Sequence, residues 1–293
     1  MNEILVIGGH GMLGRPVARR LVQEGFAVRA MARSVGRAAE VLPEAVQVVS
    51  GDVSNEDDIA RAAEGVDAVY LNLESPDPKA SFRPELDGTR MVVRALRSRP
   101  GVLLAKISAI EMGPEIDWPY AQQKRESEQV LMESGHPYLV FRPTWLMESL
   151  PLFVRGKRLA IPGHPPHPLY WVAGDDMARW VVGALRSERW HNRTITVQGP
   201  EPLTFREAAR RFVAAWDPGI KVTHFPLWPL RLAGMFMAQI GNFATLMRLT
   251  SAFAEEFQSQ DVWDALGPPQ LNIEEYVDYI RATGDFPSKS LRK

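Results

Sequence analysis

Cysteine is absent from all 293 residues of this chain. Disulfide bonds, thiolate metal sites and cysteine nucleophiles are therefore excluded. An excess of either charge is also lacking, because the formal net charge is −1. A balanced charge provides no electrostatic footprint for a nucleic acid, so we expect no such partner. His164 and His167 stand among prolines that rule out a helix, and we predict no metal site.

Long apolar segments are scarce as well. The stretch 232–247 carries no charge and is rich in methionine, phenylalanine and leucine, but its 16 residues fall short of the ~20 that cross a bilayer. We therefore predict no membrane span and expect a buried or lid helix at about 230–249, whose role stays open. The first three residues form no basic region, and the apolar run behind them is too short for a signal peptide. These features predict a cytoplasmic protein.

Three glycines follow the first apolar run of the chain. Gly8, Gly11 and Gly14 come directly after the run at 4–7, in an order that predicts a strand, a tight turn and a helix start. Glycines let the backbone approach a phosphate, and the next helix points free N–H groups and its positive dipole end at the negative charge. The pattern predicts a site for the pyrophosphate of a dinucleotide, formed by Gly8, Gly11, Met12, Leu13 and Gly14.

Apolar runs and helical patterns alternate through the first half. The runs lie at 4–7, 28–31, 46–49, 68–73, 102–107 and 138–141, and the helical patterns at about 14–24, 35–42, 55–64, 82–98 and 119–134. This alternation predicts an α/β fold with a Rossmann-type doubly wound parallel sheet. Ligands of such sheets bind at the carboxyl ends of the strands.

The pattern becomes irregular after Pro143. We expect a loop at 161–168, a helix at 174–185, a strand at 194–197, a capped helix at 204–216 and a helical remainder at 217–293. The predicted division is a NAD(P)-binding domain of 1–143 plus about 171–200, and a smaller, mostly helical substrate-side region of 144–170 plus 201–293.

The G-x-x-G-x-x-G spacing resembles the opening of the short-chain dehydrogenase/reductase superfamily in its extended and atypical branches, and most closely of its NmrA-like group. The segment from 126 to Arg142-Pro143 follows the pattern of that group as well. The resemblance implies that Asp52 and Val53 contact the adenine and that Asn72 lies beside the ribose and pyrophosphate. It also places Pro143 at the cofactor edge.

The end of the second predicted strand indicates which cofactor is bound. In dinucleotide folds an acidic residue at this place binds the adenosine ribose and selects NAD. Here the predicted strand at 27–32 is followed directly by Arg33, Arg37 lies one helical turn later, and no carboxylate occurs before Glu40. A guanidinium pairs well with a ribose phosphate. We therefore predict that Arg33 and Arg37 bind the cofactor and that NADP(H) is preferred over NAD(H).

Tyr120 and Lys124 lie four residues apart and share one face of the predicted helix at 119–134. The lysine charge is expected to lower the pKa of the phenol, so that it exchanges a proton with a carbonyl or an alcohol. Ser108 stands 12 residues before Tyr120 at the end of a strand. The three resemble the Ser–Tyr–Lys set of the superfamily. This implies that Ser108 holds the substrate oxygen and that Lys124 also binds the nicotinamide ribose.

Tryptophan and methionine are frequent in the second half, and both suit a flat or apolar ligand. We predict a substrate pocket that includes Trp145, Met147, Trp171 and Trp228. The leading hypothesis is an NADP(H)-dependent oxidoreductase that reduces a small apolar carbonyl, quinone or similar acceptor.

Two alternatives stay open. The first is a non-catalytic NADP(H)-binding sensor or regulatory protein that acts through a protein partner, because many NmrA-like proteins lack the tyrosine and serve as sensors or assembly factors. The second is a sugar-nucleotide epimerase, because epimerases use the same Ser–Tyr–Lys set.

Overall fold

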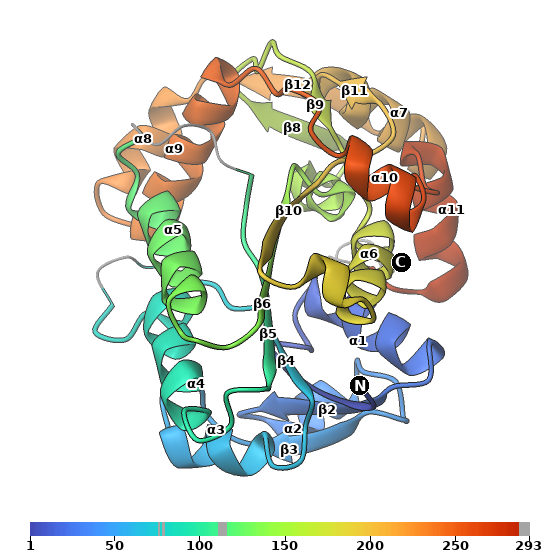
Figure 1. Ribbon diagram of the computed structural model, residues 1–293. Coiled ribbons are helices and arrows are strands. Elements are labelled where there is room, and N and C mark those ends of the chain that lie inside the picture. The colour runs from blue at the N-terminus through green and yellow to red at the C-terminus, as the bar shows by residue number, and fades with distance from the viewer. Residues whose placement is uncertain (76, 78–79, 111–115, 287–293) are drawn as a thin grey trace. The chain divides into compact units, whose positions relative to one another are not determined.

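The computed structural model of the chain describes residues 1–75, 77, 80–110 and 116–286 (Figure 1). It consists of two compact units. Unit 1 holds the described residues within 1–109, 115–142 and 177–195, and unit 2 holds those within 110–114, 143–176 and 196–293.

A seven-stranded sheet forms the centre of unit 1. Its strand order is β10-β6-β5-β4-β1-β2-β3, and every neighbouring pair from β6 to β3 is parallel. The predicted Rossmann-type α/β fold is therefore confirmed. The strands are β1 (Glu3–Ile7), β2 (Ala27–Ala32), β3 (Gln47–Ser50), β4 (Ala68–Leu71), β5 (Leu103–Ile107), β6 (Tyr138–Pro143) and β10 (Arg193–Val197).

Helices connect these strands close to the positions that the sequence predicts. Asn55 caps α3 by accepting hydrogen bonds from the N–H groups of Asp57 and Asp58. The predicted helix at 82–98 is a π-helical turn, η1, that continues into α4. The helices are α1 (Gly14–Gln23), α2 (Val35–Ala39), α3 (Glu56–Ala62), η1 (Pro84–Gly88), α4 (Thr89–Ala95), α5 (Pro119–Met132), α6 (Gly174–Leu185) and the 3-10 turn η3 (Glu188–Trp190).

Apolar side chains of the strands fill the core of unit 1. Leu5, Val69 and Leu104 from β1, β4 and β5 are fully buried, and they cluster with Ile59 of α3 and Val92 of α4. Burial of both sheet faces explains why these strands read as continuous apolar runs in the sequence. The core thus fixes the carboxyl edge of the sheet, where the predicted cofactor residues lie.

Unit 2 combines two small sheets with helices. The sheets are β12-β8-β7 and β11-β9. The strand β12 interrupts the segment 217–293, which the sequence predicts as helical, and β8 extends into the predicted loop at 161–168. Both strands are short, and β12 gains its strand hydrogen bonds from β8, 63 residues away in register. The elements are η2 (Met147–Phe153), β7 (Val154–Arg155), β8 (Arg158–Pro162), β9 (Leu169–Tyr170), β11 (Pro202–Leu203), α7 (Phe205–Trp216), β12 (Lys221–Phe225), α8 (Trp228–Gly234), α9 (Ala238–Ala252), α10 (Gln260–Leu266) and α11 (Ile273–Thr283).

The buried or lid helix expected at about 230–249 is two helices in the structure, and its first part is not buried. The chain turns between α8 and α9, and Met235, Phe236 and Met237 at this turn are 57–85% exposed. A glycine pair allows the two helices to approach closely after the turn, because a Cβ on Gly234 would lie 2.5 Å from the Cα of Gly241. The two helices therefore pack backbone to backbone. Among the described residues no helix is long and apolar enough to cross a membrane.

Candidate active site

The glycine turn after β1 has a geometry that requires glycine. Gly8 has a φ of +82°, and a Cβ there would lie 2.1 Å from the carbonyl oxygen of Asn72. A Cβ on Gly14 would lie 2.3 Å from the carbonyl oxygen of Gly8, whereas at Gly11 the closest atom would be 3.2 Å away. The β1–β4 register aligns Ile7 with Leu71, so the turn packs against Asn72. The Asn72 side chain donates a hydrogen bond to the Gly8 carbonyl over 3.1 Å.

Helix α1 begins directly behind this turn with its N-terminus open to an anion. Its N-cap is Leu13, which offers no side-chain acceptor, and its first turn contains no acidic residue. Met12 and Leu13 are half-buried. The Arg15 N–H donates to the Gly11 carbonyl over 3.0 Å, but no side chain caps the helix, and the dipole at such an N-terminus favours an anion. The predicted pyrophosphate residues therefore form one cradle in unit 1.

A positive charge stands next to this cradle. Arg33 and Arg37 are exposed after β2, and among the described residues neither makes an ion pair or a hydrogen bond. Partial desolvation and the charge of Arg33 lower the pKa of His10, an exposed residue of the glycine turn. Arg33 is therefore close enough to act electrostatically on the cradle, and its guanidinium is available for an anionic ligand.

Asp52 and Val53 follow β3 at the same carboxyl edge of the sheet. The Asp52 carboxylate accepts hydrogen bonds from the backbone N–H and the hydroxyl of Ser54, over 2.9 and 2.8 Å. The Asp52 N–H donates to Asp58 over 3.0 Å. The segment is thus shaped by local turns, and its contact with adenine stays a prediction.

The tyrosine and the lysine meet on the first turns of α5. Pro119 begins the helix, and the Nζ of Lys124 lies 5.6 Å from the centroid of the Tyr120 ring. The Trp118 ring stacks on the Tyr120 ring at 5.0 Å between centroids. No residue in the described part of the chain makes a hydrogen bond with the Tyr120 hydroxyl. The phenol is therefore oriented by its ring and keeps its hydroxyl available.

A buried carboxylate connects Lys124 to a second lysine. Glu85 Oε2 accepts a hydrogen bond from Lys124 Nζ over 2.6 Å, and Glu85 Oε1 accepts from Lys106 Nζ and from the hydroxyl of Ser127. These four residues are at most 6% exposed. Lys124 Nζ also approaches the carbonyl oxygen of Leu73, just beyond β4, at 3.5 Å. The network thus fixes the ammonium group of Lys124 at the carboxyl edge of the sheet.

The expected lowering of the Tyr120 pKa is wrong in its net direction. Burial raises the pKa of the phenol, and the opposing effect of the Lys124 charge is smaller. Burial alone would lower the pKa of Lys124, but the Glu85 carboxylate outweighs it and raises that pKa. Much of the lysine charge is thus compensated by Glu85. The structure therefore supports a Tyr120 that keeps its proton at neutral pH and can donate it.

Ser108 is engaged in a different interaction. Its hydroxyl donates a hydrogen bond to the carboxylate of Glu128, which also accepts from Arg142 Nε over 3.2 Å. Ser108 lies just beyond β5 and is 6% exposed. Its predicted role in holding the substrate oxygen stays a prediction, since this role requires the hydroxyl to leave Glu128.

Three of the four predicted pocket residues lie together in unit 2. The rings of Trp145 and Trp171 are 5.7 Å apart, and both contact the edge of Phe205 at 4.9 and 4.8 Å between centroids. Met147 belongs to the same core cluster, and Met147 and Trp171 are each 1% exposed. Trp228 lies outside this cluster and is 65% exposed. Trp145, half-buried, is thus the member of the group that a ligand can reach without repacking the core.

Pro143, predicted at the cofactor edge, is the last residue of β6. Its carbonyl accepts a hydrogen bond from the N–H of Ile110 over 2.9 Å. This contact uses the carbonyl, so the proline ring takes no part in it. The contact of Pro143 with the cofactor stays a prediction.

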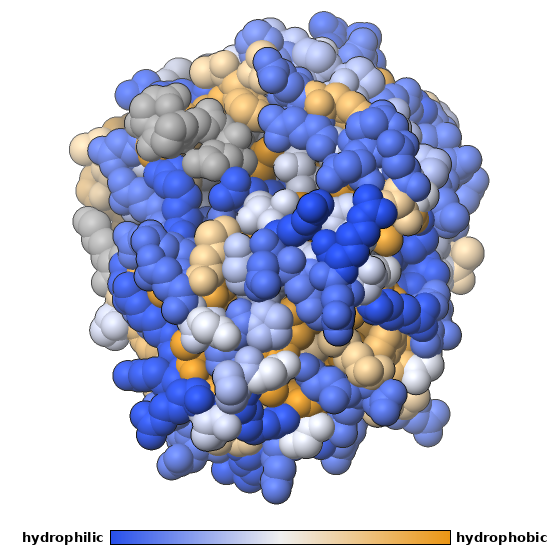
Figure 2. Space-filling model, in the orientation of Figure 1, coloured by the Kyte–Doolittle hydropathy of each residue, from blue (hydrophilic) through white to orange (hydrophobic). Residues whose placement is uncertain are grey.

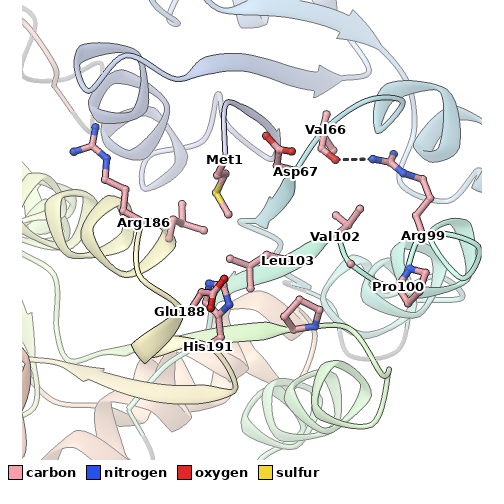
Figure 3. Close-up of a pocket in the computed structure, with 13 residues that line it drawn as sticks. Met1, Val66, Asp67, Arg99, Pro100, Val102, Leu103, Arg186, Glu188 and His191 are labelled. Atoms are coloured by element: carbon pink, nitrogen blue, oxygen red, sulfur yellow. Dashed lines mark hydrogen bonds between the residues drawn. The ribbon is translucent and has the colours of Figure 1, made fainter.

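A hollow of about 510 Å³ in unit 1 lies at the other edge of the sheet (Figure 3). Its lining includes Met1, Asp67 and Leu103, which lie at the amino ends of β1, β4 and β5. Arg99 at its rim donates to the carbonyl of Val66 over 2.6 Å. Because ligands of doubly wound sheets bind at the carboxyl ends of the strands, this hollow is separate from the glycine cradle.

Sequence reasoning missed the partners of Lys124. A buried ion pair at Lys106 was predictable from the sequence, because Lys106 is the one charged residue in the apolar run 102–107 and a buried lysine requires a counter-ion. The burial of Glu85 and Glu128 was not predictable, since both lie in polar helical segments where most carboxylates are solvated. Only the fold shows that these two carboxylates point inward.

A buried carboxyl in unit 2 was missed as well. Glu148 Oε1 accepts a hydrogen bond from the N–H of Gly174 over 2.9 Å, while Oε2 is buried without a partner among the described residues. Burial raises the pKa of Glu148 to about 7. The neutral acid is favoured here because a charge would be poorly solvated.

We expect Glu148→Gln to stabilise the protein at alkaline pH and to leave it nearly unchanged at acidic pH. The raised pKa means that the folded state binds the proton of Glu148 more tightly than the unfolded state does. The stability that this proton contributes is complete below about pH 4.5 and is lost as the pH rises through about 7. With about 1.4 kcal/mol per pKa unit, the variant should gain about 3 kcal/mol over wild type above this window. Urea unfolding across the pH range measures the difference. The exposed Glu256→Gln is the control, and an equal gain there would contradict the assignment.

Comparison with known proteins places the chain in a family. A model of the NAD(P)H-binding family matches residues 8–188. The (4-alkanoyl-5-oxo-2,5-dihydrofuran-3-yl)methyl phosphate reductase of Streptomyces griseus is 32% identical over 207 residues, which cover 70% of each chain. The chain therefore belongs to the NAD(P)H-binding family. The resemblance drawn from the glycine turn and the later motifs is confirmed at this level.

Other relatives show how varied such chains are. The photosystem II assembly factor Ycf39 of Cyanophora paradoxa is 23% identical, with 79% of this chain and 74% of that protein covered. An NADPH-dependent quinone oxidoreductase from Escherichia coli, solved in complex with NADPH, has a TM-score of 0.76 over 95% of this chain and 99% of its own, at 18% identity. At this identity the likeness shows a shared fold.

Proposed function

We propose that the protein is an NADPH-dependent reductase of a small apolar carbonyl, a quinone or a similar acceptor. One observation carries the proposal: the Tyr120 hydroxyl has no hydrogen-bond partner among the described residues and lies beside a lysine that Glu85 fixes at the carboxyl edge of the sheet. A reductase needs a proton donor at this place. The names of the Streptomyces griseus and Escherichia coli proteins, a reductase and a quinone oxidoreductase, support the same reaction class.

The cradle fits a dinucleotide. A Cβ at Gly8 or Gly14 would collide with the backbone of the turn itself, so both glycines keep the turn tight, and no side chain caps the N-terminus of α1. A bound nicotinamide cofactor would supply the hydride. Gly11 would let the pyrophosphate approach the turn, and the positive dipole end of α1 would face its charge. Asn72 keeps the turn in shape through its bond to Gly8.

The protein residues supply the proton. Tyr120 would donate its hydroxyl proton to the acceptor oxygen as that oxygen gains negative charge. The nearby ammonium of Lys124 would stabilise the phenolate that remains, and it would also bind the nicotinamide ribose. Glu85 keeps Lys124 protonated, because its carboxylate raises the pKa of that lysine. Trp118 keeps the ring in place.

The test is whether the full chain consumes NADPH in the presence of an acceptor. A panel of quinones and aliphatic or aromatic aldehydes should contain at least one that accelerates NADPH oxidation well above the rate without acceptor. No acceleration with any member, in a protein that binds NADPH, would reject the reductase assignment.

A second candidate is a cofactor sensor that acts through a protein partner. The name of the Ycf39 relative, an assembly factor, supports the protein partner. The sensor differs in its expected outcome. Such a protein binds NADP(H) without turnover, and a partner should distinguish the oxidised form of the complex from the reduced one.

Arg33→Ala is expected to weaken NADPH binding much more than NADH binding. The exposed guanidinium has no partner among the described residues, and its charge lowers the pKa of His10 in the glycine turn. Loss of one charge-assisted contact costs roughly 1.5–3 kcal/mol, or about 10-fold to 100-fold in affinity. Fluorescence titration of both cofactors measures this, with the exposed Arg61→Ala as the control. An equal loss for NADH and NADPH would show that Arg33 does not recognise the phosphate.

A further inference from the structure

Five large apolar side chains lie exposed in one short segment of unit 2. They form a patch on α8 and the turn behind it, called the hairpin patch below. Elsewhere in the described residues the exposed large apolar side chains are single ones at 39–44% exposure, and the face drawn in Figure 2 is mostly hydrophilic. A contiguous apolar patch of this kind marks an interaction site. The hairpin patch consists of Trp228, Leu232, Met235, Phe236 and Met237, at 54–85% exposure.

The patch is continuous because of the helical spacing. Trp228, Leu232 and Met235 follow each other at intervals of four and three residues, which places them on one face of α8 and its C-cap. Arg231 is exposed at the border of this face. Phe236, the most exposed of the five at 85%, lies in the turn that leads to α9. The apolar face therefore ends in an apolar tip.

The hairpin that carries the patch is firmly built. Helices α8 and α9 lie side by side (Figure 1), and Gly234 and Gly241 allow their backbones to touch. Ala244 and Met247 on α9 are buried, and Met247 belongs to the core cluster of unit 2. Helix α9 thus anchors the hairpin to the core of unit 2, and the patch on α8 stays exposed on a well-packed hairpin.

Charge decides which occupant fits the patch. The segment 218–254 contains no aspartate or glutamate, whereas Lys221, Arg231 and Arg248 give it three positive charges. Arg231 and Arg248 are exposed. An apolar face bordered by cations, free of acids and containing a tryptophan matches the interface of an anionic bilayer. A long arginine side chain can reach the headgroup phosphates while its neighbours enter the acyl region.

We propose that the hairpin patch binds the surface of an anionic lipid bilayer. Met235 and Phe236 at the tip would enter the acyl region, and Arg231 would contact the headgroup phosphates. The helices lie on the surface in this arrangement, which agrees with the finding that none of the described helices is long and apolar enough to span a membrane. The proposal is independent of turnover, because it concerns only α8, α9 and their charges.

Sedimentation of the full chain with vesicles tests the proposal. Wild type should bind vesicles of phosphatidylglycerol and phosphatidylcholine and bind vesicles of phosphatidylcholine alone more weakly. The double variant Met235→Ser/Phe236→Ser should lose at least about tenfold in partitioning, since each side chain loses most of its apolar burial. Arg231→Gln should lose about fivefold, and only on the anionic vesicles.

The matched control removes apolar side chains that are exposed elsewhere. Met132→Ser/Leu152→Ser, each 40% exposed in the wild type, should bind as wild type does. Thermal unfolding of all variants confirms that they fold, as expected for exposed positions. Absence of wild-type binding to anionic vesicles, or an equal loss in the control, would overturn the proposal. So would a wild-type dimer in sedimentation equilibrium that the Met235/Phe236 double variant converts to monomer, because the patch would then bind a second copy of the chain.

Discussion

Turnover of a quinone or an aldehyde should fall by about 10²–10⁴ in Tyr120→Phe, which is the usual share of a general acid. The phenylalanine ring can still stack on Trp118 and lie near Lys124 Nζ, so only the hydroxyl is lost. NADPH affinity should change little, because that hydroxyl makes no hydrogen bond with any described residue and is assigned to the acceptor. Steady-state NADPH oxidation and a binding titration measure the two quantities.

Lys124→Ala separates the two roles of the pair. It should weaken both NADPH binding and turnover, since Lys124 is assigned to the ribose and to the phenolate. The fold should survive, because Glu85 keeps its contact with Lys106. A wild type without turnover, together with a silent Tyr120→Phe, would assign the protein to the sensor class.

Glu85→Gln is expected to destabilise the protein by about 3–5 kcal/mol, the range for a buried charge that loses its partner. The variant keeps the shape of the side chain but leaves the ammonium groups of Lys106 and Lys124 without the carboxylate that both contact. Urea unfolding measures the loss. Glu85 raises the pKa of Lys124, so that pKa would fall in the variant. The loss of turnover on the alkaline side of the pH profile should therefore begin at a lower pH than in wild type. A purely structural Glu85 would leave that pH profile in place.

Lys106→Met is the matched control for this network. One carboxylate faces two lysines, and burial lowers the pKa of Lys106. Removal of Lys106 leaves a balanced pair of Glu85 and Lys124, so the free energy of unfolding should change far less than in Glu85→Gln. Equal losses in the two variants would show that the network stabilises by packing and that its charge balance is unimportant.

The sequence predicts the cofactor half of the molecule closely. The strands β1 to β6 and the helices α1, α3, α5 and α6 lie within a few residues of the predicted ranges. Local physics explains this. Strands buried on both faces need continuous apolar runs, and the turn at Gly8 needs a positive φ that only glycine adopts without strain.

Unit 2 was less predictable for a physical reason. The strand β12 acquires its strand hydrogen bonds from β8 across a long stretch of chain, and neither has a strong pattern of its own. The apolar composition of the segment 232–247 predicted a buried or lid helix. The close approach of its two helices depends on the contact of Gly234 with Gly241, and its exposure depends on which helix faces the core.

The sequence by itself determined the Rossmann-type fold, the glycine cradle and the pairing of Tyr120 with Lys124, since each depends on residues that are neighbours along the chain. Tertiary structure alone decided the electrostatics of the site. Glu85 lies 39 residues from Lys124 and 21 from Lys106, and burial, which raises the pKa of Tyr120, is a property of the folded core. The interaction of charges depends on the distance between them and on how much water the fold excludes around them, and the order of residues along the chain states neither the distance nor the burial.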